Sequence, residues 1–104
     1  MIVEERIYTL EVGKVPEYLR LYQEEGLAIQ TRILPRLVGY FHTEIGTLNQ
    51  VVHLWAYEDL EERARKRAEL LADEDWKAYI AKVRPLILHQ ENRILVPASF
   101  SPIR

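Results

Sequence analysis

The sequence predicts an α+β fold in which helices cover one face of a four-stranded antiparallel sheet. Segments with strand and helix patterns follow one another in the order strand, helix, strand, strand, helix pair, strand. Residues 49–57 form a strand whose two faces are both largely apolar, so both faces need cover from water. The predicted helices are sufficient for one face only. We therefore expect a second copy of the chain to cover the other face.

Length and composition predict one ordinary globular domain over residues 1–104. With 14 basic and 16 acidic residues, the net charge of −2 provides no broad positive field for nucleic acid or anionic lipid. The chain has no cysteine, which is typical of a reducing compartment. No apolar run approaches the roughly 18 residues of a membrane span. We expect a cytoplasmic protein with no nucleic-acid partner and no membrane span.

The first strand is predicted at residues 2–10, which are rich in Ile, Val, Tyr and Thr and end before a turn at Gly13. A helix follows, with Pro16 in its first turn and a predicted end before Pro35. Gly26 within this helix predicts a bend or break. Its apolar face has helical spacing and comprises Val15, Tyr18, Leu19, Tyr22, Gly26, Ile29 and Ile33.

Residues 37–43 and 49–57 are two further strands, and their closeness predicts a hairpin. An even number of loop residues would place Tyr40, His42, His53 and Trp55 on the same face. A four-residue loop at 46–49 would set His42 opposite His53 and Tyr40 opposite Trp55.

Two helices and a final strand complete the chain. Asp59 and Glu62 form a capping-box variant, and the helix that they open carries an apolar stripe of Leu60, Ala64, Ala68 and Leu71. The basic run at 63–67 is interpreted as a solvated helix surface paired with Glu61 and Glu62. A second helix begins near Asp73 and ends at Pro85, with a stripe of Trp76, Ile80 and Val83. Residues 86–96 form the last strand, and an extended tail follows.

The chain resembles the NIPSNAP family over nearly its whole length. The most specific block is Asn49-Gln50-Val51-Val52-His53-Leu54-Trp55. Further similarity lies in residues 5–10, 13–16, 37–41, 44–46 and 90–95, and in Trp76. The resemblance implies a ferredoxin-like βαββαβ protomer that pairs into a dimeric α/β barrel, with no assigned reaction. Neighbouring branches of that superfamily include small monooxygenases and haem-degrading enzymes.

Seven residues are candidates for a pocket, and we assign them to the face that lies inside the barrel. On the first strand, alternation directs Val3 and Ile7 to the helices and the opposite set inward. The facing of the last strand stays open, because His89, Glu91 and Arg93 or Gln90 and Asn92 could point inward. The candidate pocket residues are Arg6, Tyr8, Tyr40, His42, His53, Trp55 and Glu91.

Two interpretations of these residues remain open. They could line a pocket for a small apolar or aromatic ligand, either between the sheet and the helices or between the two sheets, with His53 as a general base tuned by Glu91 or His42. They could instead be hydrogen-bonded members of a homodimer interface. A cavity of several hundred Å³ beside Tyr8, Tyr40 or His53 would favour the pocket, and a filled interior would favour the interface.

The resulting functional prediction is a homodimeric NIPSNAP-like binding module for a small molecule or a protein partner. The alternative is a small enzyme of the monooxygenase or isomerase type, either cofactor-free or related to the haem enzymes. No spacing of histidines and acidic residues indicates a metal site, and no motif indicates a bound cofactor, so we expect neither. Whether the chain is an enzyme stays open.

Overall fold

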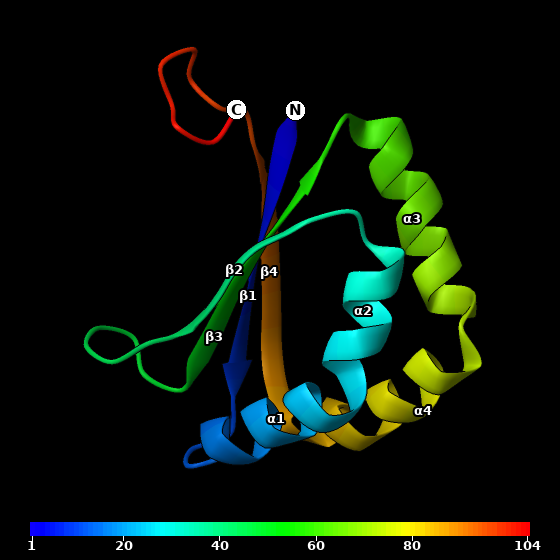
Figure 1. Ribbon diagram of the computed structural model, residues 1–104. Helices are drawn as coiled ribbons and strands as arrows, with labels where there is room; N and C mark the ends of the chain where they lie inside the picture. Colours follow the sequence, from blue (N-terminus) through cyan, green and yellow to red (C-terminus); the bar gives the residue numbers. More distant parts are fainter.

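The computed structural model describes all residues, 1–104, and has the predicted α+β ferredoxin-like architecture. Four antiparallel strands form one sheet in the order β2-β3-β1-β4, and the helices all lie on one face of it (Figure 1). No helix is long and apolar enough to span a membrane. The elements are β1 (Ile2–Leu10), α1 (Val15–Leu21), α2 (Leu27–Ile33), β2 (Leu37–His42), β3 (Gln50–Tyr57), α3 (Leu60–Ala72), α4 (Glu74–Val83) and β4 (Ile87–Leu95).

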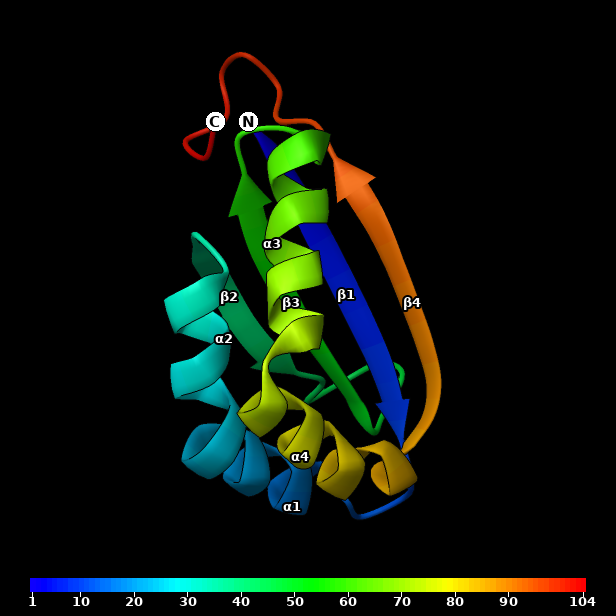
Figure 2. The ribbon, with the colours of Figure 1, turned by 90° about the vertical axis from the view of Figure 1, so that its right-hand side faces the viewer.

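The first helical segment bends at Gly26, as the sequence predicts. A π-helical turn, Tyr22–Gly26, joins α1 to α2, and the two helices run in different directions in Figure 2. A Cβ atom at position 26 would lie 2.9 Å from Cζ of Tyr79 on α4. Glycine therefore allows the bent segment to approach α4 closely.

The helix-covered face of the sheet is the opposite of the one predicted. Val51, His53 and Trp55 are buried beneath the helices, and Glu4 pairs with Trp55 on the same face. Val52 and Leu54, together with Ile7, occupy the face without helices, called the open face below. Alternation correctly separated the two sets of side chains. It could not say which set the helices cover, because both sets are largely apolar on β3.

In the β2–β3 hairpin, Tyr40 and His42 share a face with His53, as predicted, but the register of the two strands differs from the prediction. Tyr40 lies opposite His53 and His42 opposite Val51, a shift of two residues from the expected pairing. The pair His42–Val51 encloses residues 43–50, an even number as predicted, and two of these residues, Gly46 and Asn49, have positive φ. Because a shift of two residues keeps every side chain on its own face, the prediction of the shared face is correct although the predicted register is wrong.

The facing of β4 is decided by its pairing with β1. Gln90 lies opposite Tyr8 and Asn92 opposite Arg6, so these two side chains are on the helix-covered face. Glu91 lies opposite Ile7, on the open face. A register shift between Thr9 and Leu10 interrupts the alternation near the start of β4.

The apolar stripe predicted to bury α3 is exposed, and this prediction is wrong. Leu60 and Leu71 are 59% and 57% exposed, and only Leu70 of this helix is buried. Arg63 instead faces the sheet, where it binds the Glu4 carboxylate. The capping prediction is correct, because Asp59 accepts a hydrogen bond from the Glu62 backbone N–H. The stripe on α4 is also correct, with Trp76 and Val83 buried.

The C-terminal tail lies against the open face near the start of β1. Val96, Pro97 and Ile103 line a groove together with Val3 and Leu54 of the sheet. The tail therefore packs on the sheet of its own protomer, whereas Phe100 remains exposed.

A buried carboxylate joins three elements of the fold. Glu4 on β1 is fully buried and accepts two hydrogen bonds from Arg63 of α3, one from Asn92 of β4 and one from Arg6. Burial by itself would raise the pKa of Glu4. The hydrogen bonds from Arg63 and Asn92 and the charges of Arg6 and Arg63 outweigh burial and lower the pKa to about 2.

Replacement of this carboxylate should destabilise the fold strongly. Glu4→Gln keeps the side-chain shape but leaves buried cations without their anion, at a cost of about 3–5 kcal/mol in the free energy of unfolding. Glu24→Gln is the control, because its pair with Arg20 is exposed and contributes about 0.5 kcal/mol. Urea denaturation measures both. Equal midpoints for the two variants would contradict the structural role of Glu4.

Candidate functional site

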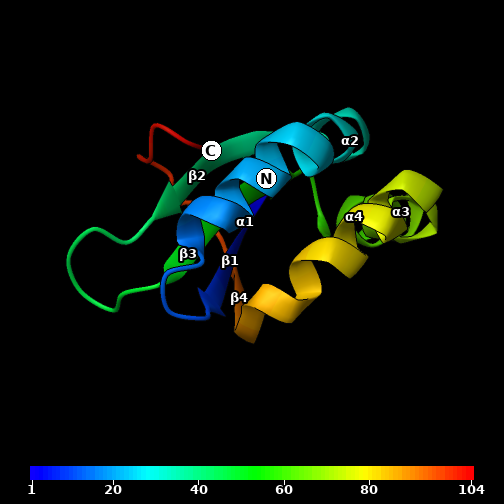
Figure 3. The same cartoon turned by 90° about the horizontal axis from the view of Figure 1, so that it is seen from below.

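A cavity of about 420 Å³ lies between the sheet and the helices. In Figure 3, α2 lies toward β2 and α4 lies beside the start of β4. Leu71, Arg84 and Leu88 are exposed lining residues, so the mouth opens between α3, α4 and β4. The lining residues are Arg6, Tyr8, Tyr18, Tyr22, Gln30, Tyr40, His53, Arg67, Leu71, Trp76, Tyr79, Ile80, Val83, Arg84, Ile87, Leu88, His89 and Gln90.

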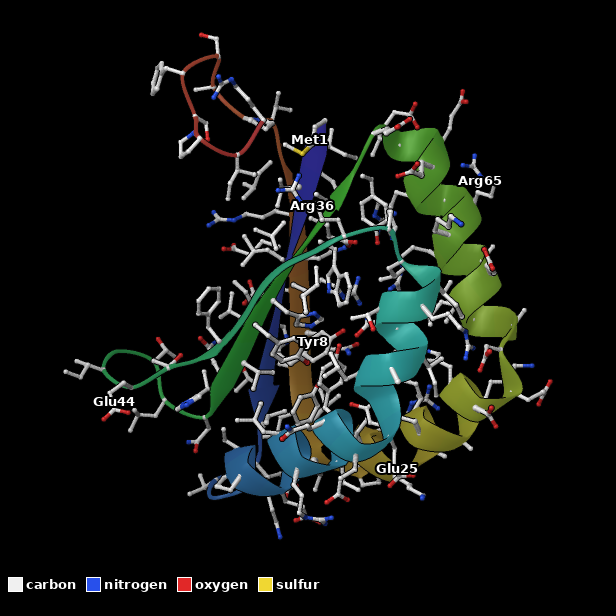
Figure 4. The ribbon with its side chains drawn as sticks, in the orientation of Figure 1. Met1, Tyr8, Glu25, Arg36, Glu44 and Arg65 are labelled. Carbon is white, nitrogen blue, oxygen red and sulfur yellow. The ribbon has the colours of Figure 1, made fainter.

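Aromatic rings from the sheet and from the first helical segment form one wall of the cavity. Tyr40 of β2 stacks on His53 with 4.5 Å between ring centroids, and Tyr22 stacks on Tyr40 at 4.6 Å. Tyr8 meets His53 edge to face at 4.9 Å and lies between sheet and helices in Figure 4. The Tyr18 and Tyr40 hydroxyls are hydrogen-bonded at 2.8 Å. These contacts hold a rigid surface suited to flat apolar groups.

His53 is held neutral, with its proton on Nε2. The Trp55 indole N–H, which can only donate, binds Nδ1 of His53 at 2.8 Å, so Nδ1 must be the unprotonated acceptor. Burial lowers the pKa of His53 to about 3, and the positive charges of Arg6 and Arg67 act in the same direction. The Nε2 atom is buried and has no hydrogen-bond partner. His53 therefore offers a hydrogen-bond donor at neutral pH, which contradicts its predicted role as a general base.

The two arginines nearest to His53 differ in their partners. Arg6 donates from Nε to the Tyr8 hydroxyl at 2.9 Å and from Nη1 to Glu4 at 3.0 Å. The guanidinium of Arg67 on α3 makes neither a hydrogen bond nor an ion pair, and the residue is only partly exposed. Burial and the charge of Arg6 lower the pKa of Arg67. Arg67 is thus a charged group with unused donors beside the cavity.

The structure separates the residues that were predicted to form the pocket. Arg6, Tyr8, Tyr40 and His53 line the cavity. Trp55 lies behind the wall, where it binds and orients His53. His42, at the exposed end of β2, and Glu91, on the open face, lie away from the cavity and cannot tune His53.

Several lining residues were missed because they were interpreted as core or surface. Tyr18 and Tyr22 were assigned to a packing face, although two tyrosines four residues apart on one helix face also suit a pocket wall. Arg67 was assigned to the solvated basic run. Arg67 follows Arg63 by four residues, a spacing that places both side chains on the same side of the helix. This spacing was the signal in the sequence that the two arginines face the same way.

The structure contains no group of three or more His, Asp or Glu side chains arranged to hold a metal ion. Chemically, the cavity offers apolar and aromatic surface, a neutral imidazole donor and a guanidinium. Such a set can bind a flat molecule and polarise an acceptor oxygen on it.

The chain is similar to known proteins over most of its length. The profile of the NIPSNAP family matches residues 3–102. NipSnap homolog 2 of Danio rerio is 38% identical over 99% of this chain, and this chain spans 35% of that protein's length. A crystal structure of a NIPSNAP family protein from Agrobacterium tumefaciens is 53% identical, with a TM-score of 0.97 over 99% of this chain and 98% of that one.

A more distant likeness concerns the fold alone. SnoaB, a cofactor-independent oxygenase from Streptomyces nogalater, superposes with a TM-score of 0.66 at 17% identity, over 97% of this chain and 96% of that chain.

The buried neutral imidazole predicts a pH-dependent stability. The pKa of His53 falls from its ordinary 6.5 to about 3 on folding, so the unfolded chain binds the proton more readily between these values. The free energy of unfolding should therefore fall as the pH is lowered, by about 2 kcal/mol between pH ~6.5 and ~4.5. Protonation of Glu4 should lower the free energy of unfolding further as the pH falls below the ordinary pKa of this carboxyl, 4.5.

The variant His53→Asn keeps an acceptor for Trp55 and removes the titrating group, so it should flatten this dependence. His42→Asn, at an exposed position, is the matched control and should keep it. Urea denaturation over the pH series measures the slopes. A slope in His53→Asn as steep as in the wild type would show that His53 is not the responsible group.

Proposed function

The chain belongs to the NIPSNAP family, and on that premise we propose that it is a homodimeric barrel protein whose cavity binds a small aromatic or apolar molecule. The observation that carries the proposal is the cavity of about 420 Å³ beside Tyr8, Tyr40 and His53. Its volume lies within the range of small-molecule sites, roughly 300–1,000 Å³. A protein that acts only as a scaffold for other proteins does not require a cavity of this volume.

The lining supports a ligand with a flat apolar part. Hydrophobic residues make up 11 of the 18 lining residues, and tyrosines supply much of that surface. The few polar groups come from separate elements, such as His53 from β3 and Arg67 from α3. This combination of an apolar wall with a few convergent polar groups is characteristic of small-molecule sites.

The open face supports the homodimer. Ile7, Val52 and Leu54 form an apolar centre on this face, and the ring of Phe41 lies over Gly39 with 57% of the residue exposed. No helix lies on this face of the sheet (Figure 1). Two such faces packed together would remove them from water, with about 25 cal/mol gained for each Å² of apolar surface. In the dimer, the two sheets would form the barrel and the cavities would lie outside it.

A cofactor-free enzyme is the second candidate function. It is favoured by the unpartnered Nε2–H of His53 in a cavity wall, since a buried neutral donor can polarise a carbonyl or enolate oxygen of a substrate. Turnover of a bound compound by the purified protein, with no added cofactor, would distinguish this candidate from a binding module.

The homodimer predicts the effect of a charge on the open face. Phe41→Glu should yield a folded monomer, because the exposed ring contributes little to the protomer but would be buried between two sheets. Ile45→Glu is the control, since Ile45 lies in the β2–β3 loop and is 92% exposed. Light scattering of wild type and variants measures the molecular mass. A wild-type protein that is monomeric at micromolar concentration would refute the dimer.

Ligand binding predicts thermal stabilisation. A small aromatic compound at 100 times its dissociation constant should raise the free energy of unfolding by about 2.7 kcal/mol. Leu88→Trp should abolish this shift by filling the mouth, while the melting temperature without ligand stays close to wild type because Leu88 is 64% exposed. Ile45→Trp is the remote control and should retain the shift. A shift of equal size in Leu88→Trp would place binding elsewhere.

A further inference from the structure

We infer that the ligand of this cavity carries an anionic oxygen, a carboxylate, enolate or phenolate on a flat apolar body, bound by the Arg67 guanidinium and the His53 Nε2–H. This inference rests on the proposed ligand-binding function and specifies the chemical class of the ligand. It is carried by the free donors at the cavity and by the distribution of charge around it.

The Nε2–H of His53 is buried and has no partner within the chain. Tyr40 covers a face of the imidazole at 4.5 Å, and the Trp55 N–H occupies Nδ1 at 2.8 Å. Tyr8 packs against the ring edge to face. His53 is only 1% exposed, so its Nε2–H has no access to bulk water, yet it has no acceptor within the chain. A buried donor without a partner is costly, and an acceptor atom of a bound ligand would satisfy it.

The side chains that line the cavity carry a positive net charge. Its 18 lining residues include three arginines, Arg6, Arg67 and Arg84, and no Asp or Glu, although the whole chain has a net charge of −2. The nearby carboxylate, Glu4, is already bound by Arg6, Arg63 and Asn92. A positive cavity in a slightly acidic protein indicates a negatively charged occupant.

Arg67 is the residue best placed to bind a negatively charged ligand. Arg6 is held by Glu4 and Tyr8, and Arg84 is exposed at the mouth. Arg67 is partly buried and has all its donors free. Arg67 and His53 line the same cavity, so one ligand can contact both groups. An oxygen between them would accept from both groups and gain a charge-assisted hydrogen bond.

The aromatic wall excludes a bare inorganic anion as the preferred ligand. Tyr22 and Tyr40 stack in succession on His53, and Tyr8 completes the surface beside the donor. A flat conjugated acid could place its ring against these tyrosines while its oxygen reaches His53 and Arg67. Sulfate or phosphate would meet the donors but leave the apolar surface empty.

The test compares aryl acids with their neutral amides by titration calorimetry. The pairs are benzoate with benzamide, cinnamate with cinnamamide, and naphthoate with naphthamide, and sulfate is titrated separately. The acid of at least one pair should bind wild type about tenfold or more tightly than its amide, the ratio expected for one charge-assisted hydrogen bond. Sulfate should bind more weakly than that acid.

Two variants locate the contacts. Arg67→Gln should remove the preference for the acid and leave the affinity for the amide within about twofold. His53→Asn should weaken both members of a pair, because both present an acceptor oxygen. Arg65→Gln is the matched control, since Arg65 lies on the outer side of α3 in Figure 4 and should leave every affinity unchanged. Circular dichroism melting verifies that each variant is folded.

The outcomes separate this inference from the proposed function. Equal binding of acid and amide, or an acid preference that persists in Arg67→Gln, would overturn the anionic ligand and keep a ligand-binding cavity. Tighter binding of sulfate than of any aryl acid would also overturn it. If none of the aryl compounds binds and none shifts the melting temperature, the proposed function fails together with the inference.

Discussion

The buried carboxylate of Glu4 is the interaction on which the arrangement of sheet and helices depends. A carboxylate removed from water is stable only when cations and hydrogen-bond donors surround it, so α3 must keep Arg63 turned toward β1. This requirement sets the rotation of the helix about its axis. It directs Arg67, one turn further, toward the cavity. One acidic residue thus determines both the packing of α3 and the positive charge at the site.

The two faces of the sheet carry different kinds of side chains. The helix-covered face carries the polar network of Glu4, the aromatic wall and the cavity. The open face carries an apolar centre, and the Glu5–Arg93 ion pair lies toward the β4 edge. Because neighbouring residues of a strand point to opposite faces, the block at 49–57 contributes His53 and Trp55 to the site and Val52 and Leu54 to the open face. A change at one face of β3 can therefore leave the other face intact.

Trp55 shows how a buried neighbour determines the chemistry of a residue in the cavity wall. Its indole can only donate, so the nitrogen that it contacts on His53 must accept, and the proton is confined to the other nitrogen. In isolation, a histidine in a strand indicates a base that titrates near neutral pH. Packed behind tyrosines and bound by Trp55, it is a fixed neutral donor. Sequence could place His53 near a site, but its protonation depended on a neighbour two residues away in the same strand.

The sequence by itself determined the order of the elements, the bend at Gly26, the Asp59 cap and the parity of the hairpin, because each follows from local spacing and backbone preference. It also brought Arg6, Tyr8, Tyr40 and His53 to one face. Only the tertiary structure decided which face the helices cover, which side of α3 is buried, and that His42 and Glu91 lie away from the cavity. These features depend on contacts between segments that are distant in the sequence, above all the contact of Glu4 with Arg63. Hydrophobic periodicity predicts that the apolar stripe of a helix is buried. It does not reveal a buried carboxylate whose need for a cation turns a different side of the helix toward the sheet.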